Sequence, residues 1–346
     1  MAQQTVDHEP REVEVDLLIV GAGPAGLFGA YYAGFRGWTV AVVDSLPEIG
    51  GQVSALYPEK AILDVAGFPN VKGRVLVEQL VEQAASAQPT YLLDRTATGL
   101  TIDAASEGGV TMELDDGSTV RAKVVIITAG IGKFTPRPLP AGDGWEGRGL
   151  VFFVPSFAEY AGRDVVIVGG GDSAFDWAHS LQPIASSVTL VHRRDRFRAH
   201  QATVDAVLAS DVEVITNAQV TALTGDGIVE KVEITTNDGE VLVRPAQGVV
   251  AALGFVADLG AMKDWGLDLD KRHILVDTAM RTNLPRVFAA GDITEYEGKV
   301  RLIAVGFGEV ATAVNNAAVV IDPTPTCSPA TPARVPRWRR RATPYA

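Results

Sequence analysis

The order of apolar and polar positions is the same in two separate segments of the chain. In the first, the apolar run 13–20 predicts a buried strand, and a glycine-rich turn follows it at once. A stretch of helical periodicity over 25–35 and a second apolar run over 38–44 come next. A strand, a turn, a helix and a strand form a βαβ unit, and such units build a parallel sheet with helices on its faces.

The second segment repeats this unit between residues 164 and 191, again with a glycine-rich turn between the first strand and the helix. The sequence therefore predicts an α/β fold with two doubly wound, Rossmann-like dinucleotide-binding domains. Because the patterns after residue 254 complete the first unit, we expect the second domain to be inserted in the first. The expected boundaries are residues 1–131 and 255–321 for the first domain, 132–254 for the second, and 322–346 for an extended tail rich in proline and arginine.

Small antiparallel inserts are expected in both domains. Alternating patterns flank two turn signals, Asp115-Asp116-Gly117 and Asn237-Asp238-Gly239. A separate buried strand is expected over 124–128, and a helix over 302–314.

Composition and charge narrow the possible partners. The formal net charge of −12 argues against nucleic acid, because a phosphate-binding surface needs an excess of Lys and Arg. We see no signal peptide, and no apolar run that approaches the roughly 20 residues of a membrane helix. The single cysteine, Cys327, excludes an intrachain disulfide and stands apart from other possible metal ligands. We therefore expect a cytoplasmic protein without a metal or a membrane partner.

The first glycine-rich turn, residues 21–26, fits the pattern G-x-G-x-x-G. In this pattern the first glycine makes the turn, the second lets the backbone approach a pyrophosphate, and the third lets the helix pack on the strand. Asp44 follows roughly 20 residues later, where an acid accepts both ribose hydroxyls and repels a 2′-phosphate. This turn therefore predicts a dinucleotide whose adenosine ribose carries no 2′-phosphate.

The second glycine-rich turn, residues 169–174, is followed by a basic cluster instead of an acid. Such a cluster suits a 2′-phosphate, which it can bind through charge-assisted hydrogen bonds; the alternative interpretation is a solvated basic loop. NADPH is therefore expected here. The residues expected to bind it are Gly169, Gly171, Asp172, Ser173, His192, Arg193, Arg194 and Arg198.

Two dinucleotide sites of opposite ribose chemistry imply two cofactors, and the useful pair is a bound flavin with an exchanging nicotinamide. The first site should hold FAD. The strand end at Gly291-Asp292 offers a carboxylate to the flavin ribityl chain, and the helix after it offers a positive N-terminus.

Together these elements resemble the two-dinucleotide-domain flavoprotein family that contains thioredoxin reductase. The chain is most similar to the thioredoxin-reductase-like class of ferredoxin–NADP reductases, through residues 50–60, 64–69, 134–137 and 169–177. The resemblance implies a homodimer in which the Tyr57 ring stacks on the isoalloxazine. With the motif above, it gives the residues expected to bind FAD: Gly21, Gly23, Pro24, Ala25, Gly26, Asp44, Gly51, Gln52, Tyr57, Ala97, Phe134, Gly291 and Asp292.

The catalytic cysteine pair of thioredoxin reductase is replaced here by Phe-Phe-Val-Pro at residues 152–155, which excludes disulfide exchange. The expected activity is electron transfer between NADPH and ferredoxin, through hydride transfer to flavin N5 and one-electron steps to an iron–sulfur protein, with flavodoxin as the alternative partner. The alternatives are an NADPH-dependent diaphorase or quinone reductase, and a flavin redox sensor without turnover.

The tail departs from the resemblance. The related reductases end near a Leu-Phe-Pro-Gly-His-Ser-Ser-like run, whereas residues 327–333 here are Cys-Ser-Pro-Ala-Thr-Pro-Ala. Codons for the first run, read one base later, give the second. We therefore hypothesise a reading-frame shift shortly before Cys327, which sequencing of the gene would test.

Overall fold

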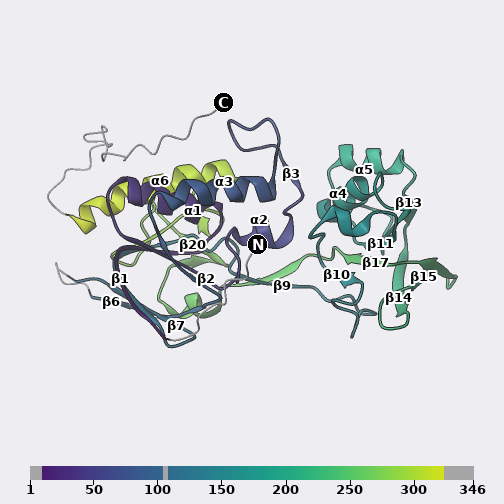
Figure 1. Ribbon diagram of the computed structural model, residues 1–346, viewed down its shortest axis with the longest axis horizontal. Coiled ribbons are helices and arrows are strands. Elements are labelled where there is room, and N and C mark those ends of the chain that lie inside the picture. The colour runs from purple at the N-terminus through teal and green to yellow at the C-terminus, as the bar shows by residue number, and fades with distance from the viewer. Residues whose placement is uncertain (1–9, 104–107, 323–346) are drawn as a thin grey trace, which may run out of the picture.

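The computed structural model describes residues 10–103 and 108–322, so the tail hypothesis lies outside the described residues. The chain forms two lobes joined by a narrow ribbon (Figure 1). The first lobe is built from both ends of the described chain, and the second from its middle. The predicted fold class, a second dinucleotide-binding domain inserted in the first, is thereby confirmed.

The first lobe contains a seven-stranded sheet in the order β5-β2-β1-β8-β7-β6, with β21 paired to β8. The pairs among β5, β2, β1, β8 and β21 are parallel, whereas β6, β7 and β8 form an antiparallel insert. These strands are β1 (Glu12–Val20), β2 (Val40–Asp44), β5 (Thr90–Leu93), β6 (Ala97–Ile102), β7 (Val110–Leu114), β8 (Thr119–Ile127) and β21 (Val287–Ala289).

Strand β8 corrects one expectation. The second strand of the Asp115 hairpin and the buried run near 124 are one continuous strand. It pairs with β1 along its whole length. Its first half also pairs with β7 and alternates between buried and more exposed residues, whereas its second half also pairs with β21 and is buried throughout. Two burial patterns in one strand therefore look like two elements in the sequence.

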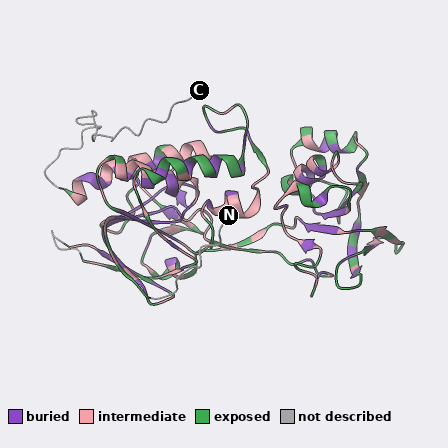
Figure 2. Cartoon of the chain, in the orientation of Figure 1, coloured by how far each residue is buried: buried purple, intermediate pink, exposed green. Residues whose placement is uncertain are grey.

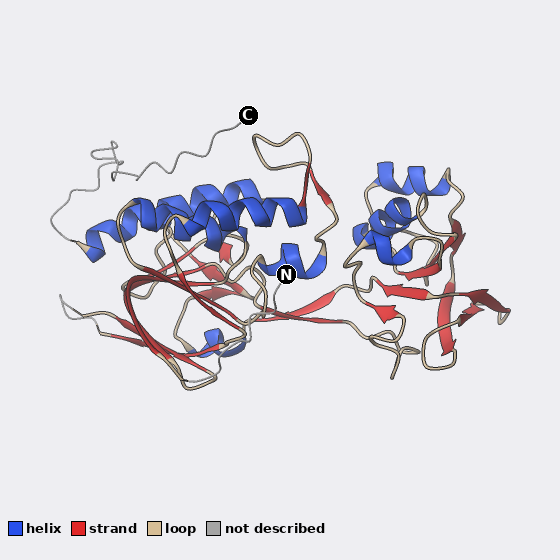
Figure 3. Ribbon diagram, viewed as in Figure 1, coloured by secondary structure: helices blue, strands red, loops and turns tan. Residues whose placement is uncertain are grey.

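Three helices cover one face of this sheet, namely α1 (Pro24–Phe35), α3 (Gly73–Ala85) and α6 (Ile303–Ile321) (Figure 3). The expected helix over 302–314 is thus seven residues longer at its C-terminal end. By length and composition alone α6 could span a membrane, so the expectation that no apolar run approaches that length is wrong. Its inner residues, among them Val310 and Val314, are fully buried in the first lobe's core, which accounts for this composition (Figure 2).

The second lobe has three layers. Its central sheet is parallel, in the order β10-β17-β11-β12-β13, and helices α4 and α5 pack on one face. An antiparallel sheet, β14-β15-β16, packs on the other. The elements are β10 (Leu150–Val151), β11 (Asp164–Val168), α4 (Asp172–Leu181), β12 (Ser187–Val191), α5 (Gln201–Leu208), β13 (Glu213–Ile215), β14 (Ala218–Thr224), β15 (Lys231–Thr236), β16 (Val241–Pro245) and β17 (Gly248–Ala251).

The ribbon between the lobes consists of two antiparallel strands, β9 (Lys133–Pro136) and β18 (Phe255–Asp258). Glycines with left-handed backbone precede each strand, Gly130 and Gly132 before β9 and Gly254 before β18. The remaining short elements are α2 (Gly51–Leu56), β3 (Ala61–Ile62), β4 (Val71–Lys72), η1 (Phe157–Tyr160), η2 (Gly260–Asp264), β19 (Leu269–Asp270), β20 (His273–Leu275) and β22 (Thr294–Glu295).

Candidate functional site

The first glycine-rich turn connects the C-terminal end of β1 to the N-terminus of α1, which begins at Pro24. Proline fits the first helical position because its missing N–H would have no helical partner there. At two positions of the turn only glycine fits, because a Cβ would clash with backbone atoms of the protein. A Cβ on Gly21 would lie 2.5 Å from the Thr128 carbonyl oxygen, and one on Gly26 would lie 1.9 Å from the Gly21 carbonyl oxygen.

Gly23, the middle glycine, is different. A Cβ built on it meets no protein atom within 4 Å, and its φ of −71° is open to any residue. The protein therefore leaves free space beside Gly23, in front of the N–H groups that begin α1. A helix N-terminus with free space in front of it is a ready anion site.

Asp44 ends β2 beside this turn. Its carboxylate accepts the Ala22 N–H at 2.6 Å and the Leu46 N–H at 2.8 Å. Burial raises the pKa of Asp44, and these two hydrogen bonds oppose the rise. Each carboxylate oxygen keeps a further lone pair for a ligand hydroxyl.

A cavity of about 300 Å³ opens at this edge of the sheet. It is mostly apolar with a few convergent polar groups, as cofactor sites usually are. Gly26 does not line it and acts only in helix packing. The cavity brings together the other twelve residues expected to bind FAD: Gly21, Gly23, Pro24, Ala25, Asp44, Gly51, Gln52, Tyr57, Ala97, Phe134, Gly291 and Asp292.

Tyr57 follows α2 and lies where the two lobes meet. Its ring lines the cavity and also packs against the core of the second lobe. Burial, with smaller contributions from the Asp292 and Asp64 charges, raises the pKa of Tyr57 to about 12. The phenol is therefore neutral at physiological pH and can act as an apolar, hydrogen-bonding ring.

The Gly291-Asp292 turn follows β21 and lies against the first turn, since a Cβ on Gly291 would be 3.4 Å from the Ala25 Cβ. Burial raises the pKa of Asp292, whereas the charges of Lys299 and Arg301 lower it. The N-terminus of α6 also faces the cavity, through Ile303 and Gly306.

Several cavity residues carried no sequence signal. The segment from Leu259 to Met262, with Trp265, follows the ribbon and lines the cavity through a short 3₁₀ turn that has no motif. The buried indole N–H of Trp265 has no hydrogen-bond partner within the described parts of the chain. Thr128 to Gly130 also line the cavity, at the end of a strand whose buried run was visible in the sequence.

The second glycine-rich turn connects β11 to α4, whose N-cap is Gly171. A Cβ on Gly171 meets no protein atom within 4 Å, as at Gly23, whereas one on Gly170 would lie 2.3 Å from the His192 ring. Ser173 is in the first turn of α4. Asp172 has a structural contact, since its carboxylate accepts the His200 N–H at 2.8 Å and so holds the start of α5.

The basic cluster lies beside this turn. The backbone N–H of Arg198 donates to the Gly170 carbonyl at 2.7 Å. Partial burial lowers the pKa of His192, and the charges of Arg193, Arg194 and Arg198 lower it further. The three arginines are exposed. A neutral imidazole surrounded by guanidinium groups leaves the arginines to supply the positive charge.

The two glycine-rich turns do not share one cavity. Among the described residues, none between 135 and 258 lines the cavity at the first turn. The lobes instead meet through the Lys60–Asp176 ion pair at 2.7 Å and through Arg74, which donates to the Pro155 carbonyl at 3.3 Å. Within residues 10–103 and 108–322, no group of three or more His, Cys, Asp or Glu side chains comes together to hold a metal.

Comparisons with known proteins agree with this geometry. A family model described as pyridine nucleotide-disulphide oxidoreductase matches residues 15–317. A ferredoxin–NADP reductase from Nocardioides sp. is 74% identical over 312 residues, which cover 90% of this chain and 94% of the relative. One from Frankia alni is 64% identical over 308 residues, which cover 89% and 95%.

Solved structures show the same fold. The thioredoxin reductase of T. acidophilum matches with a TM-score of 0.71 and 30% identity, covering 88% of this chain and 97% of that one. The thioredoxin reductase of Lactococcus lactis also gives 0.71, with 25% identity and coverage of 89% and 99%. The resemblance inferred from the motifs is confirmed, and so is the expectation of FAD and NADP(H) as cofactors. The chain therefore belongs to the pyridine nucleotide-disulphide oxidoreductase family and, within it, to the ferredoxin–NADP reductases of the thioredoxin-reductase-like class.

Proposed function

We propose that this enzyme moves electrons between NADPH and ferredoxin, with FAD held in the cavity of the first lobe and NADPH on the second. One observation carries the proposal. Each of the two turns has a glycine with free space beside it, and the side chains next to the two glycines have opposite charges. Gly23 stands beside the acid Asp44, and Gly171 stands beside the cluster of Arg193, Arg194 and Arg198. The names of the relatives support ferredoxin as the partner.

The residues of the cavity fit FAD. A diphosphate would take the space beside Gly23, where the N-terminus of α1 supplies N–H donors. Asp44 would accept the hydroxyls of the adenosine ribose, and Asp292 those of the ribityl chain. Tyr57 would stack on the flavin ring, because its ring lines the cavity and its phenol is neutral.

The second lobe would hold NADPH. Its diphosphate fits the space beside Gly171 at the N-terminus of α4, and the exposed arginines fit the 2′-phosphate. When bound, the flavin supplies the chemistry that couples two-electron hydride transfer to one-electron transfer. The contribution of the chain is to position both nucleotides, since hydride transfer depends on geometry more than on acid or base groups.

The absorbance spectrum of the purified protein, before and after anaerobic NADPH, tests this function. We expect a flavin spectrum that bleaches with NADPH, and reduction of cytochrome c that depends on added ferredoxin. Bleaching without ferredoxin dependence would indicate a diaphorase or quinone reductase. A flavin that NADPH does not reduce would indicate a redox sensor, and a protein that neither contains nor binds FAD would contradict the proposal.

The diaphorase alternative has one observation in its favour. The net charge of −12 opposes an acidic partner unless a local basic surface exists. Flavodoxin in place of ferredoxin would face the same repulsion. The rate that ferredoxin adds to cytochrome reduction, measured at saturating NADPH and at two salt concentrations, separates the two cases, because docking of the carrier protein makes this added rate salt-dependent.

We also propose a cytoplasmic homodimer. An apolar groove lies on the first lobe, between α1, α3 and α6, and its aromatic lining includes Phe28, Tyr31, Phe68 and Phe307. These four side chains are partly exposed, and apolar surface patches commonly mark protein interfaces. Sedimentation equilibrium of the purified protein would show a monomer if the dimer is wrong, and cell fractionation tests the compartment.

A further inference from the structure

Helix α6 contains one charged residue, Glu309, and its side chain is buried. A carboxylate inside an apolar core is costly unless it is paired and hydrogen-bonded. The proposed roles of Asp44, Asp292 and Tyr57 do not use Glu309, and Glu309 does not line the cavity. Its contacts therefore call for an explanation.

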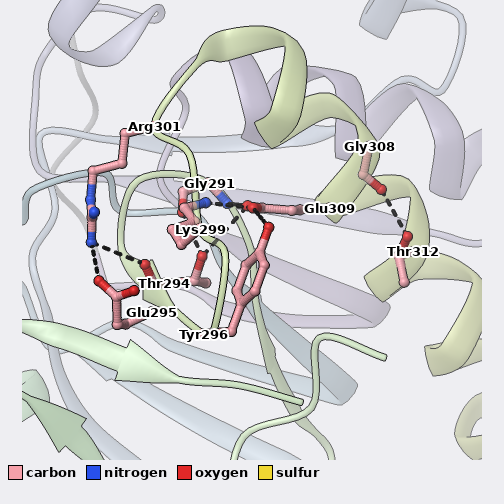
Figure 4. Close-up of polar contacts among 9 residues, drawn as sticks. All are labelled: Gly291, Thr294, Glu295, Tyr296, Lys299, Arg301, Gly308, Glu309 and Thr312. Carbon is pink, nitrogen blue, oxygen red and sulfur yellow. Dashed lines mark hydrogen bonds and ion pairs between the residues drawn. The ribbon is translucent and has the colours of Figure 1, made fainter. Parts of the chain in front are cut away.

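Three donors converge on the Glu309 carboxylate (Figure 4). The Gly291 N–H donates to Oε2 at 2.7 Å, and the Tyr296 hydroxyl donates to Oε1 at 2.6 Å. Lys299 forms an ion pair with Oε1, and its side chain is only 1% exposed. Both charges of this pair are thus shielded from water, and each depends on the other for compensation.

The same network also holds the carbonyl group of Gly291. The Gly291 carbonyl accepts a hydrogen bond from Lys299 Nζ at 2.9 Å and one from Thr294 Oγ1 at 2.8 Å. Gly291 has a left-handed backbone, with a φ of +83°. Its carbonyl belongs to the peptide that leads directly to Asp292, so the network fixes the orientation of the residue that lines the cavity.

We propose that Glu309 is a positioning residue for FAD. Through Gly291, Glu309 holds Asp292 against the bound cofactor, and its carboxylate compensates the charge of Lys299 close to that cofactor. The proposal rests on the proposed FAD site, in which Asp292 meets the ribityl chain. Glu309 would thus have two separable effects, one on the geometry of the turn and one on the local charge. Different substitutions at position 309 separate them.

The first variant is Glu309→Gln, compared with the wild type by titration of the apoprotein with FAD and by the midpoint potential of the bound flavin. We expect FAD binding to weaken roughly tenfold or more, because a charge-assisted hydrogen bond to Gly291 is lost. We also expect a higher midpoint potential, because the buried charge of Lys299 loses its partner and favours the reduced cofactor. In Lys299→Met/Glu309→Gln the potential should return toward the wild-type value.

The second variant, Glu309→Asp, keeps the charge but shortens the side chain. We expect it to weaken FAD binding while the midpoint potential stays unchanged. It also keeps the proposal testable if Glu309→Gln does not fold. Wild-type FAD affinity in both Glu309→Asp and the double variant would overturn the proposal.

Two matched controls come from the same region (Figure 4). Glu295→Gln removes an acid from the exposed pair with Arg301, whose atoms are 2.6 Å apart, and so leaves a solvent-screened charge. Thr312→Ala removes the hydroxyl that donates to the Gly308 carbonyl at 2.9 Å, one turn along α6. Both should bind FAD as the wild type does, and equal losses in the controls would contradict a specific role for Glu309. Since FAD affinity and potential are measured without ferredoxin, the absence of ferredoxin-dependent turnover would contradict the proposed function alone.

Discussion

A chain with Gly23→Ala is expected to fold as the wild type does and to bind FAD on the order of 100-fold more weakly. The new methyl group meets no protein atom within 4 Å, so the apoprotein has room for it. We expect its free energy of unfolding to change by less than about 0.5 kcal/mol. The methyl group would occupy the space proposed for the FAD diphosphate, and titration of the apoprotein with FAD measures the loss.

Gly26→Ala, three residues later, should instead destabilise the fold of the apoprotein. A Cβ there lies 1.9 Å from a backbone oxygen of Gly21, which cannot move without breaking the turn. We expect destabilisation of at least about 3 kcal/mol, measured by denaturant unfolding of the apoprotein.

Gly171→Ala is the matched control, because it occupies the same position in the second turn and also has free space around its Cβ. It should retain FAD and weaken NADPH binding. If Gly23→Ala bound FAD normally, or if Gly171→Ala released it, the assignment of the two cofactors would be wrong.

Arg193→Ala and Arg194→Ala should each lower kcat/KM for NADPH by roughly 10- to 100-fold, since each removes a charge-assisted hydrogen bond to the 2′-phosphate. The kcat/KM for NADH, which has no such phosphate, should change little. Steady-state kinetics with both nucleotides gives the ratio directly.

Arg196→Ala controls for the general loss of positive charge. Arg196 belongs to the same exposed loop, and its contact with His192 uses the backbone carbonyl, which the substitution keeps. For this variant, the ratio of kcat/KM for NADPH to kcat/KM for NADH should equal the wild-type ratio. An unchanged ratio in Arg193→Ala and Arg194→Ala would show that these arginines do not bind the phosphate.

The sequence predicts the parts of the site that depend on local geometry. Gly21 and Gly26 are required by backbone atoms only a few residues away or on the adjacent strand, and Asp44 ends a strand that must lie beside the turn. Constraints of this kind can be recognised from the spacing of residues along the sequence. The fold class and twelve residues of the cavity follow from them and from the resemblance.

Other parts of the site depend on contacts between distant segments. Trp265 reaches the cavity only because the chain returns through the ribbon, and no periodicity marks that return. Asp172 was expected to bind NADPH, yet its visible contact is with the His200 N–H, 28 residues away. Glu309 did have a signal, because a single acid within an apolar helix requires a buried partner.

The pairing of β21 with β8 joins residues 287–289 to residues 125–127, and the whole second lobe lies between these two segments in the sequence. The core of the first lobe also needs Val310 and Val314, which lie near the end of the described chain. During synthesis, the second lobe is therefore complete while the first still lacks a strand and a helix. We expect ribosome-bound chains of increasing length to gain protease protection around residues 164–191 before residues 17–20. The enzyme would thus fold from its middle outward, although its N-terminal residues are made first.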